Sequence, residues 1–139
     1  MVDSRTGFDG PGYVGLAAGR IVDSGPVAGN SSLEMFGAHQ HLEFPRGVLL
    51  PGLVDLHAHP AVEDSKYGID PDVHLLPRGT TTVLSQGDAG ANNWPRYRDR
   101  VINNARTRVR LALNLAASGE SNLGHSLGIV EEADVDACV

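Results

Sequence analysis

The distribution of apolar and polar residues predicts three strands separated by helices in the second part of the chain. A largely apolar run covers 48–56 and leads directly into His57 and His59. An apolar run that does not alternate with polar residues is typical of a strand covered on both faces, as in a parallel sheet. Shorter runs of β-branched and apolar residues at 80–85 and 108–116 predict the second and third strands.

Helices are predicted between these strands. Asp70 and Pro71 begin the first helix, because aspartate is a favoured N-cap residue and proline is tolerated best at the first helical position. Asn93 is the expected cap of a second helix, and 131–138 has the composition of the start of a third. Strands that alternate with helices indicate βαβ units, and therefore an α/β fold with a parallel sheet.

The beginning of the chain is predicted to form a separate β-rich part. Residues 13–25 have the pattern of two strands joined by a tight turn at Gly19, and 33–45 has that of a further strand with a break. We therefore expect two domains, 1–47 and 48–139.

His57 and His59 lie one residue apart at the end of the first apolar strand. Because side chains alternate across a strand, Asp55, His57 and His59 are expected to point to the same side. Two imidazoles placed in this way can bind one metal ion, and a catalytic zinc takes about three protein ligands and an open position. Asp55 is expected to hold a ring N–H of a ligand. Histidines on strands are also often ordinary hydrogen-bonded neighbours, so the pair alone leaves that alternative open.

A second pair, His39 and His41, has the same spacing. It lies in polar sequence with Glu43 and Arg46 and does not follow an apolar strand. We expect this pair to be incidental.

Four polar residues follow the second and third predicted strands. Active sites lie at the carboxyl ends of parallel barrel strands, so position alone makes these residues candidates for lining a pocket. They are Gln86, Asp88, Asn114 and Ser118. No catalytic residue is assigned from the sequence.

Composition excludes several classes of partner. The net charge is −6 and the basic residues form no stripe, which argues against nucleic acid. No apolar run approaches the length of a membrane span, and the first residues lack the apolar core of a signal peptide. Cys138 is the single cysteine, so no disulfide can form within the chain. We expect a cytoplasmic protein without a membrane partner.

The stretch Pro-Gly-Leu-Val-Asp-Leu-His-Ala-His at 51–59 resembles the first-strand signature of the amidohydrolase superfamily of metal-dependent hydrolases. The stretches at 67–72, 78–83 and 87–91 are similar to the deacetylase-like and aminoacylase-like branch. The resemblance implies a TIM-type (β/α) barrel beside a small composite β-sandwich. This chain would hold the first three β/α units of that barrel and a short segment of the sandwich.

The resemblance also implies a chemistry. Members hydrolyse a C–N bond of an amide or N-acyl compound with water activated by one or two divalent metal ions, of which zinc is the expected one. His57 and His59 would be metal ligands. The bridging lysine or glutamate, the two later histidines and the last-strand aspartate of the family have no matching positions here, and neither Lys66 nor His125 is assigned to them. The implied partners are a small-molecule amide substrate and, in a full-length form, further copies of the chain.

A complete barrel of this type takes about 250 residues, whereas this chain has 139. We therefore expect the N-terminal fragment of an amidohydrolase, inactive by itself. Two alternatives stay open. One is a truncated remnant without catalytic activity, and the other is a small α/β interaction module in which the histidines are incidental.

Overall fold

The computed structural model describes residues 1–27, 37–61, 67–120 and 136. The chain divides into two compact units, Met1–Pro51 and Gly52–Val139, and each is described by itself. The helix start predicted at 131–138 lies outside the described residues, apart from Asp136. The assignment of the first part to a partial β-sandwich stays a prediction.

The described part of the first unit contains two small antiparallel sheets. Their strands are β1 (Val2–Asp3) paired with β2 (Phe8–Asp9), and β3 (Gly12–Ala17) paired with β4 (Arg20–Pro26). Ala18 and Gly19 join β3 to β4 with φ angles of 49° and 73°. Positive φ at both central residues is the backbone of the tight turns whose twist suits a hairpin. The strand–turn–strand prediction for 13–25 is confirmed.

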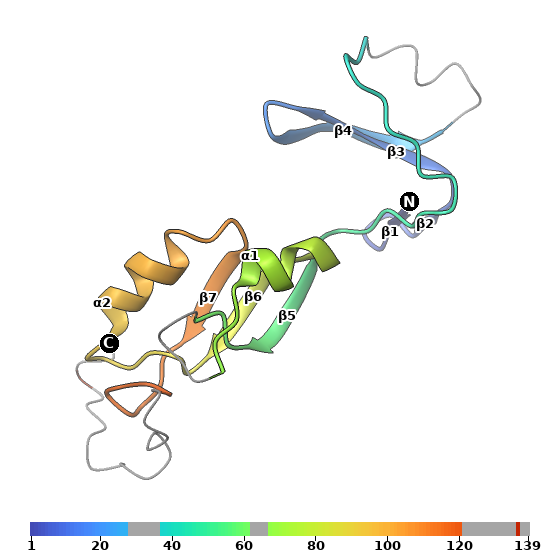
Figure 1. The fold of residues 1–139 in the computed structure, drawn as a ribbon. Helices are drawn as coiled ribbons and strands as arrows, with labels where there is room; N and C mark the ends of the chain where they lie inside the picture. The colour runs from blue at the N-terminus through green and yellow to red at the C-terminus, as the bar shows by residue number, and fades with distance from the viewer. Residues whose placement is uncertain (28–36, 62–66, 121–135, 137–139) are drawn as a thin grey trace. The chain divides into compact units, whose positions relative to one another are not determined.

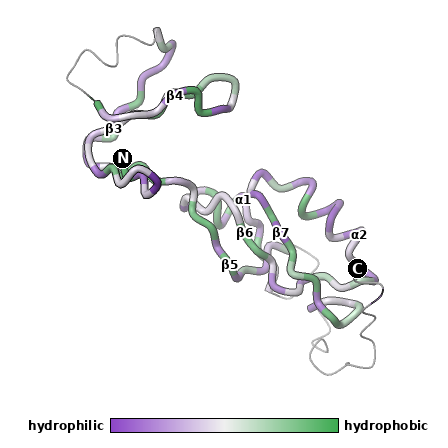
Figure 2. Tube along the Cα trace, turned by 180° about the vertical axis from the view of Figure 1, so that it is seen from behind, coloured by the Kyte–Doolittle hydropathy of each residue, from purple (hydrophilic) through white to green (hydrophobic). Residues whose placement is uncertain are grey.

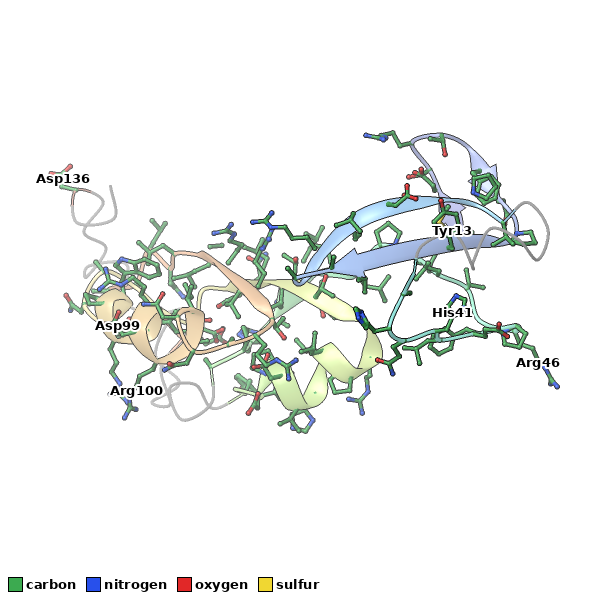
Figure 3. All side chains as sticks on the ribbon, turned by 90° about the horizontal axis from the view of Figure 1, so that it is seen from above. Tyr13, His41, Arg46, Asp99, Arg100 and Asp136 are labelled. Atoms are coloured by element: carbon green, nitrogen blue, oxygen red, sulfur yellow. The ribbon has the colours of Figure 1, made fainter. Side chains whose placement is uncertain are left out.

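The strand predicted at 33–45 is wrong for its described part, because 37–45 contains no strand. Leu42 and Phe44 are 67% and 74% exposed, and Gly47 donates to the carbonyl oxygen of Phe44 at 2.9 Å to close a turn. Within the described residues, this turning stretch pairs with no strand. Figure 3 labels His41 in this stretch, and both His39 and His41 are exposed.

The second unit is an α/β arrangement around a three-stranded parallel sheet (Figure 1). The strands are β5 (Leu53–Ala58), β6 (Thr80–Gln86) and β7 (Arg108–Ala112), in that order across the sheet. Between β5 and β6 come α1 (Pro71–His74) and the 3₁₀ turn η2 (Leu76–Arg78), and between β6 and β7 come α2 (Trp94–Tyr97) and the π-helical turn η3 (Arg98–Ile102). The predicted alternation of parallel strands and helices is confirmed. Among the described residues, no helix is long and apolar enough to span a membrane.

The starts of the two helices differ in how they are capped. Asp70 Oδ1 accepts the N–H groups of Asp72 and Val73 at 2.9 and 3.3 Å, and Pro71 takes the first helical position, as predicted. Asn93 precedes α2, but its side chain forms no capping hydrogen bond to that helix. The predicted helix start after Asn93 is confirmed, and the Asn93 side-chain amide makes its contacts outside the helix, as described below.

The buried core of this unit lies between the sheet and the helices that follow β6. Val83 on β6 and Val109 on β7 are 0% and 2% exposed, and they pack with Tyr97 and Val101. Apolar burial of this kind is the main favourable term in folding. The core therefore fixes the relative positions of β6, β7 and the α2–η3 segment.

The prediction that the first apolar strand is covered on both faces is wrong for the described structure. Leu53, Val54 and Leu56 on β5 are 52%, 59% and 67% exposed, whereas Ala58 packs against the core. Figure 2 shows both hydrophobic and hydrophilic segments along β5. The strand is at the edge of the three-stranded sheet and pairs with β6 alone, so one side of its backbone is unpaired within the described sheet.

The carboxylate of Asp72 joins α1 to the start of β7. Its oxygens accept the backbone N–H groups of Arg106 and Thr107, both at 2.7 Å, and the Thr107 hydroxyl at 2.8 Å. Partial burial by itself raises the pKa of this carboxyl. The three hydrogen bonds outweigh that effect, so the pKa of Asp72 lies below its ordinary value.

Asp72→Asn is expected to lower the free energy of unfolding by about 1–3 kcal/mol at pH 7, because the amide carries no charge and its NH2 group cannot accept a hydrogen bond. A lowered folded-state pKa contributes stability above the unfolded pKa, about 4, and this contribution disappears as the pH falls through the folded value. The difference between wild type and variant in urea unfolding should therefore shrink below about pH 4.

Asp99→Asn is the matched control. The Asp99 side chain is 60% exposed and contacts Arg98 at 3.0 Å, and an exposed pair of this kind contributes little. Equal unfolding midpoints for wild type and Asp72→Asn at pH 7 would contradict the assigned role of Asp72.

Candidate active site

The carboxyl ends of β5 and β6 bring the predicted histidines next to the loop after β6. In the parallel register Ala58 pairs with Ser85, His59 follows β5 directly, and Asp88 lies two residues beyond β6. In α/β folds this end of a parallel sheet is where ligands bind. The register therefore places His59 and Asp88 within reach of each other.

A chain of three side chains connects the two strand ends. His59 Nδ1 lies 2.8 Å from Asp88 Oδ1, and the Ser85 hydroxyl donates to Asp88 Oδ2 at 2.5 Å. Asp88 and Ser85 are both fully buried, while the His59 side chain is 21% exposed. Glu120 Oε2 is 3.9 Å from the same His59 nitrogen, beyond hydrogen-bonding distance. Asp88 therefore holds one edge of the His59 ring.

His57 and His59 lie close together with different surroundings. Their ring centroids are 5.7 Å apart and their planes are inclined at 70°. His57 is exposed, and the Tyr67 ring lies 6.1 Å from that of His59. Within 1–27, 37–61, 67–120 and 136, no group of three or more His, Cys, Asp or Glu side chains is arranged to hold a metal ion.

Asp55 has a different partner from the one expected. Its Oδ1 accepts the backbone N–H of His57 at 2.9 Å. In the structure the ring contact expected of Asp55 is made by Asp88 to His59. The metal-ligand roles of His57 and His59 stay predictions.

Two of the polar residues expected to line a pocket form hydrogen bonds to backbone atoms, and their pocket-lining roles stay predictions. Gln86 Nε2 donates to the carbonyl oxygen of Leu56 at 2.8 Å, which connects β6 to β5. Asn114 Nδ2 donates to Gly87 O at 3.1 Å, and its Oδ1 accepts the N–H of Ala116 at 2.9 Å. These contacts give Gln86 and Asn114 a part in holding the strand ends and loops.

Comparison with known proteins identifies relatives over much of the chain. It is 30% identical over 112 residues to the deacetylase Atu3266 of Agrobacterium fabrum, which covers 79% of this chain and 28% of the relative. It is 32% identical over 88 residues to a deacetylase of Brucella anthropi, covering 62% of this chain and 22% of the relative. No family model matches the chain.

Two solved structures have a similar fold over 63% of this chain. One is a dihydroorotase, with a TM-score of 0.58 and 31% identity over 25% of its length. The other is an adenine deaminase, with a TM-score of 0.56 and 25% identity over 23% of its length. These similarities point to the amidohydrolase superfamily. The chain spans about a quarter of the length of the relatives and solved structures that it matches.

The loops after β6 and β7 approach each other closely. Asn93 accepts the N–H of Gly90 at 2.8 Å and donates to Ser118 O at 2.9 Å. A Cβ at Gly90 would lie within 3 Å of the carbonyl oxygens of Ala116 and Ala117. Ser118, also expected to line the pocket, takes part through its backbone. The glycines in these two loops were the sequence signal for this approach. A single sequence does not show which loops such glycines bring together.

Gly119, in the loop after β7, lies directly against the backbone of Asp88. It has φ of 66°, and a Cβ there would meet Asp88 O at 2.5 Å and the backbone of Ala89. Only glycine accommodates both the positive φ and this contact without strain. The position of the Asp88 backbone therefore depends on the absence of a side chain at 119.

Gly119→Ala is expected to destabilise the chain by more than Gly79→Ala. Gly79 also has a positive φ, 90°, but a Cβ there meets nothing within 4 Å. Gly79→Ala should therefore lower the free energy of unfolding by the backbone strain alone, about 1–3 kcal/mol. Gly119→Ala should lower it by a similar strain and, in addition, by the clash with Asp88. Urea unfolding of both variants measures the difference. An equal or smaller loss for Gly119→Ala would contradict the close approach of the two loops.

Proposed function

We propose that this chain contributes the first metal ligands, His57 and His59, of an enzyme that hydrolyses a C–N bond in a small amide or N-acyl compound. The observation that carries the proposal is the pair of adjacent imidazoles at the carboxyl end of β5. One of them, the His59 ring, contacts the Asp88 carboxylate through Nδ1. The similarity to two deacetylases supports an N-acyl substrate.

The side chains present are of a type that binds divalent ions, but they are too few to complete a site. Imidazole nitrogen is a ligand that zinc favours, and catalytic zinc sites take about three protein ligands. The described residues supply two imidazoles and no group of three ligands. We propose that the remaining ligands come from residues outside the described part of the chain. When bound, a divalent ion supplies a Lewis acid and makes water more acidic near neutral pH.

The residues of this chain would position and shape that centre. His57 is exposed and accessible to an ion, and His59 has one ring nitrogen held by a buried carboxylate. Gln86 and Asn114 fix the strand ends that present the histidines. Proton transfer to the leaving nitrogen has no assigned residue among these.

We further propose that β5, β6 and β7 are the first three strands of a (β/α) barrel. Their parallel order and the helices between them support this fold. The exposed apolar side chains of Leu53, Val54 and Leu56 support the same interpretation, because further strands and helices would cover them. An interaction module without catalysis is the second candidate, and the lack of a three-ligand group among the described residues favours it.

His57→Ala and His59→Ala should each weaken zinc binding by tenfold or more, because each removes one of two proposed ligands. Isothermal titration of the metal-free chain with zinc measures the affinities. His39→Ala and His41→Ala are the matched controls, since this second pair has the same spacing and is exposed. Similar losses in all four variants would contradict the ligand assignment and favour the interaction module.

The catalytic part of the proposal is tested on the native product purified from its source cell. We expect a chain longer than 139 residues that hydrolyses N-acetyl amino acids with zinc bound and loses this activity on His57→Ala. The 139-residue chain alone should show no turnover. A native product of 139 residues without activity would contradict the enzymatic function, and turnover by the short chain would contradict the need for further ligands.

A further inference from the structure

We propose that Asp88 is a positioning residue that fixes the tautomer of His59, so that Nδ1 carries the proton and Nε2 presents its lone pair to a ligand. The use of that lone pair for a metal ion rests on the proposed function. The tautomer itself rests on the hydrogen bonds alone.

The contacts of Asp88 support His59 Nδ1 as the donor. Asp88 Oδ2 accepts the Ser85 hydroxyl at 2.5 Å, and Oδ1 faces His59 Nδ1 at 2.8 Å. With Oδ1 accepting as Oδ2 does, the facing imidazole nitrogen is the one that carries the proton. A neutral imidazole that donates from Nδ1 has an unprotonated Nε2, the form in which histidine binds metals.

Asp88 is held too firmly to act as a ligand itself. It is fully buried, and both of its oxygens have partners. The residues on each side are tied to the β7 end of the sheet, since Gly87 donates to Ala112 O at 3.0 Å and Ala89 O accepts from Asn114 at 2.8 Å. A side chain fixed in this way is suited to orienting a neighbouring ring.

The neighbouring carboxylates do not supply the same contact. Asp55 accepts the backbone N–H of His57, and Glu120 is 3.9 Å from His59 Nδ1. Among the described residues, the His57 ring has no carboxylate partner like that of His59. The proposed orientation by a side-chain carboxylate therefore concerns His59.

The tautomer is measured by long-range ¹H–¹⁵N correlation spectra of the metal-free chain labelled at histidine, at a pH where the rings are neutral. We expect His59 to be protonated at Nδ1, while the exposed His39 and His41 serve as internal references for a ring in solvent. Protonation of His59 at Nε2 in the wild type would overturn the proposal without any variant being needed.

A pair of variants then isolates the carboxylate. Ser85→Ala removes the second partner and leaves Asp88, so His59 should keep its tautomer. Ser85→Ala with Asp88→Leu removes the carboxylate without leaving the serine hydroxyl buried and unpaired. In this double variant His59 should adopt the tautomer mixture of His39, and zinc affinity should fall about 10- to 100-fold relative to Ser85→Ala. The methyl signals of Val83 and Val109 report whether the core is intact.

The two proposals fail separately. An unchanged tautomer and an unchanged zinc affinity in the double variant would overturn the role of Asp88, while the losses on His57→Ala and His59→Ala would still support the metal site. Absence of zinc binding by the wild-type chain, with His59 protonated at Nδ1, would contradict the metal function and support the positioning by Asp88.

Discussion

The candidate site depends on the buried carboxylate of Asp88. Burying a carboxylate away from solvent is costly unless hydrogen bonds compensate it, and here its partners are the Ser85 hydroxyl and His59 Nδ1. Ser85 belongs to β6 and His59 follows β5, so the carboxylate joins the ends of two neighbouring strands. The same contacts that satisfy its charge therefore set the orientation of the imidazole proposed to bind a metal ion.

Local sequence signals predicted the elements around this site. Pro71 after Asp70 was enough to place the start of α1, because capping involves groups within a few residues of each other. The β-branched run of β6 and the alternation of strands with helices gave the parallel sheet. The pair of histidines at the end of β5 was also visible as a motif, and its chemistry stays a proposal.

Long-range contacts were not predictable from the sequence. Asp55, two residues from His57, was expected to hold a histidine ring, but it accepts the backbone N–H of His57. The observed ring contact joins His59 to Asp88, 29 residues further along the chain. The expected burial of β5 failed for a related reason, because its exposure depends on which elements pack against it and not on its own apolar residues. Single-sequence patterns describe one strand at a time and do not specify its neighbours.

The central claim is that His57 and His59 bind one metal ion, with His59 using Nε2. A crystal structure of the chain soaked in zinc, with anomalous data at the zinc edge, tests it most directly. The account predicts a zinc peak bonded to His59 Nε2 and to a nitrogen of His57, with His59 Nδ1 still facing Asp88. A peak bonded to His59 Nδ1, or zinc bound at His39 and His41 with none at His57 and His59, would contradict it.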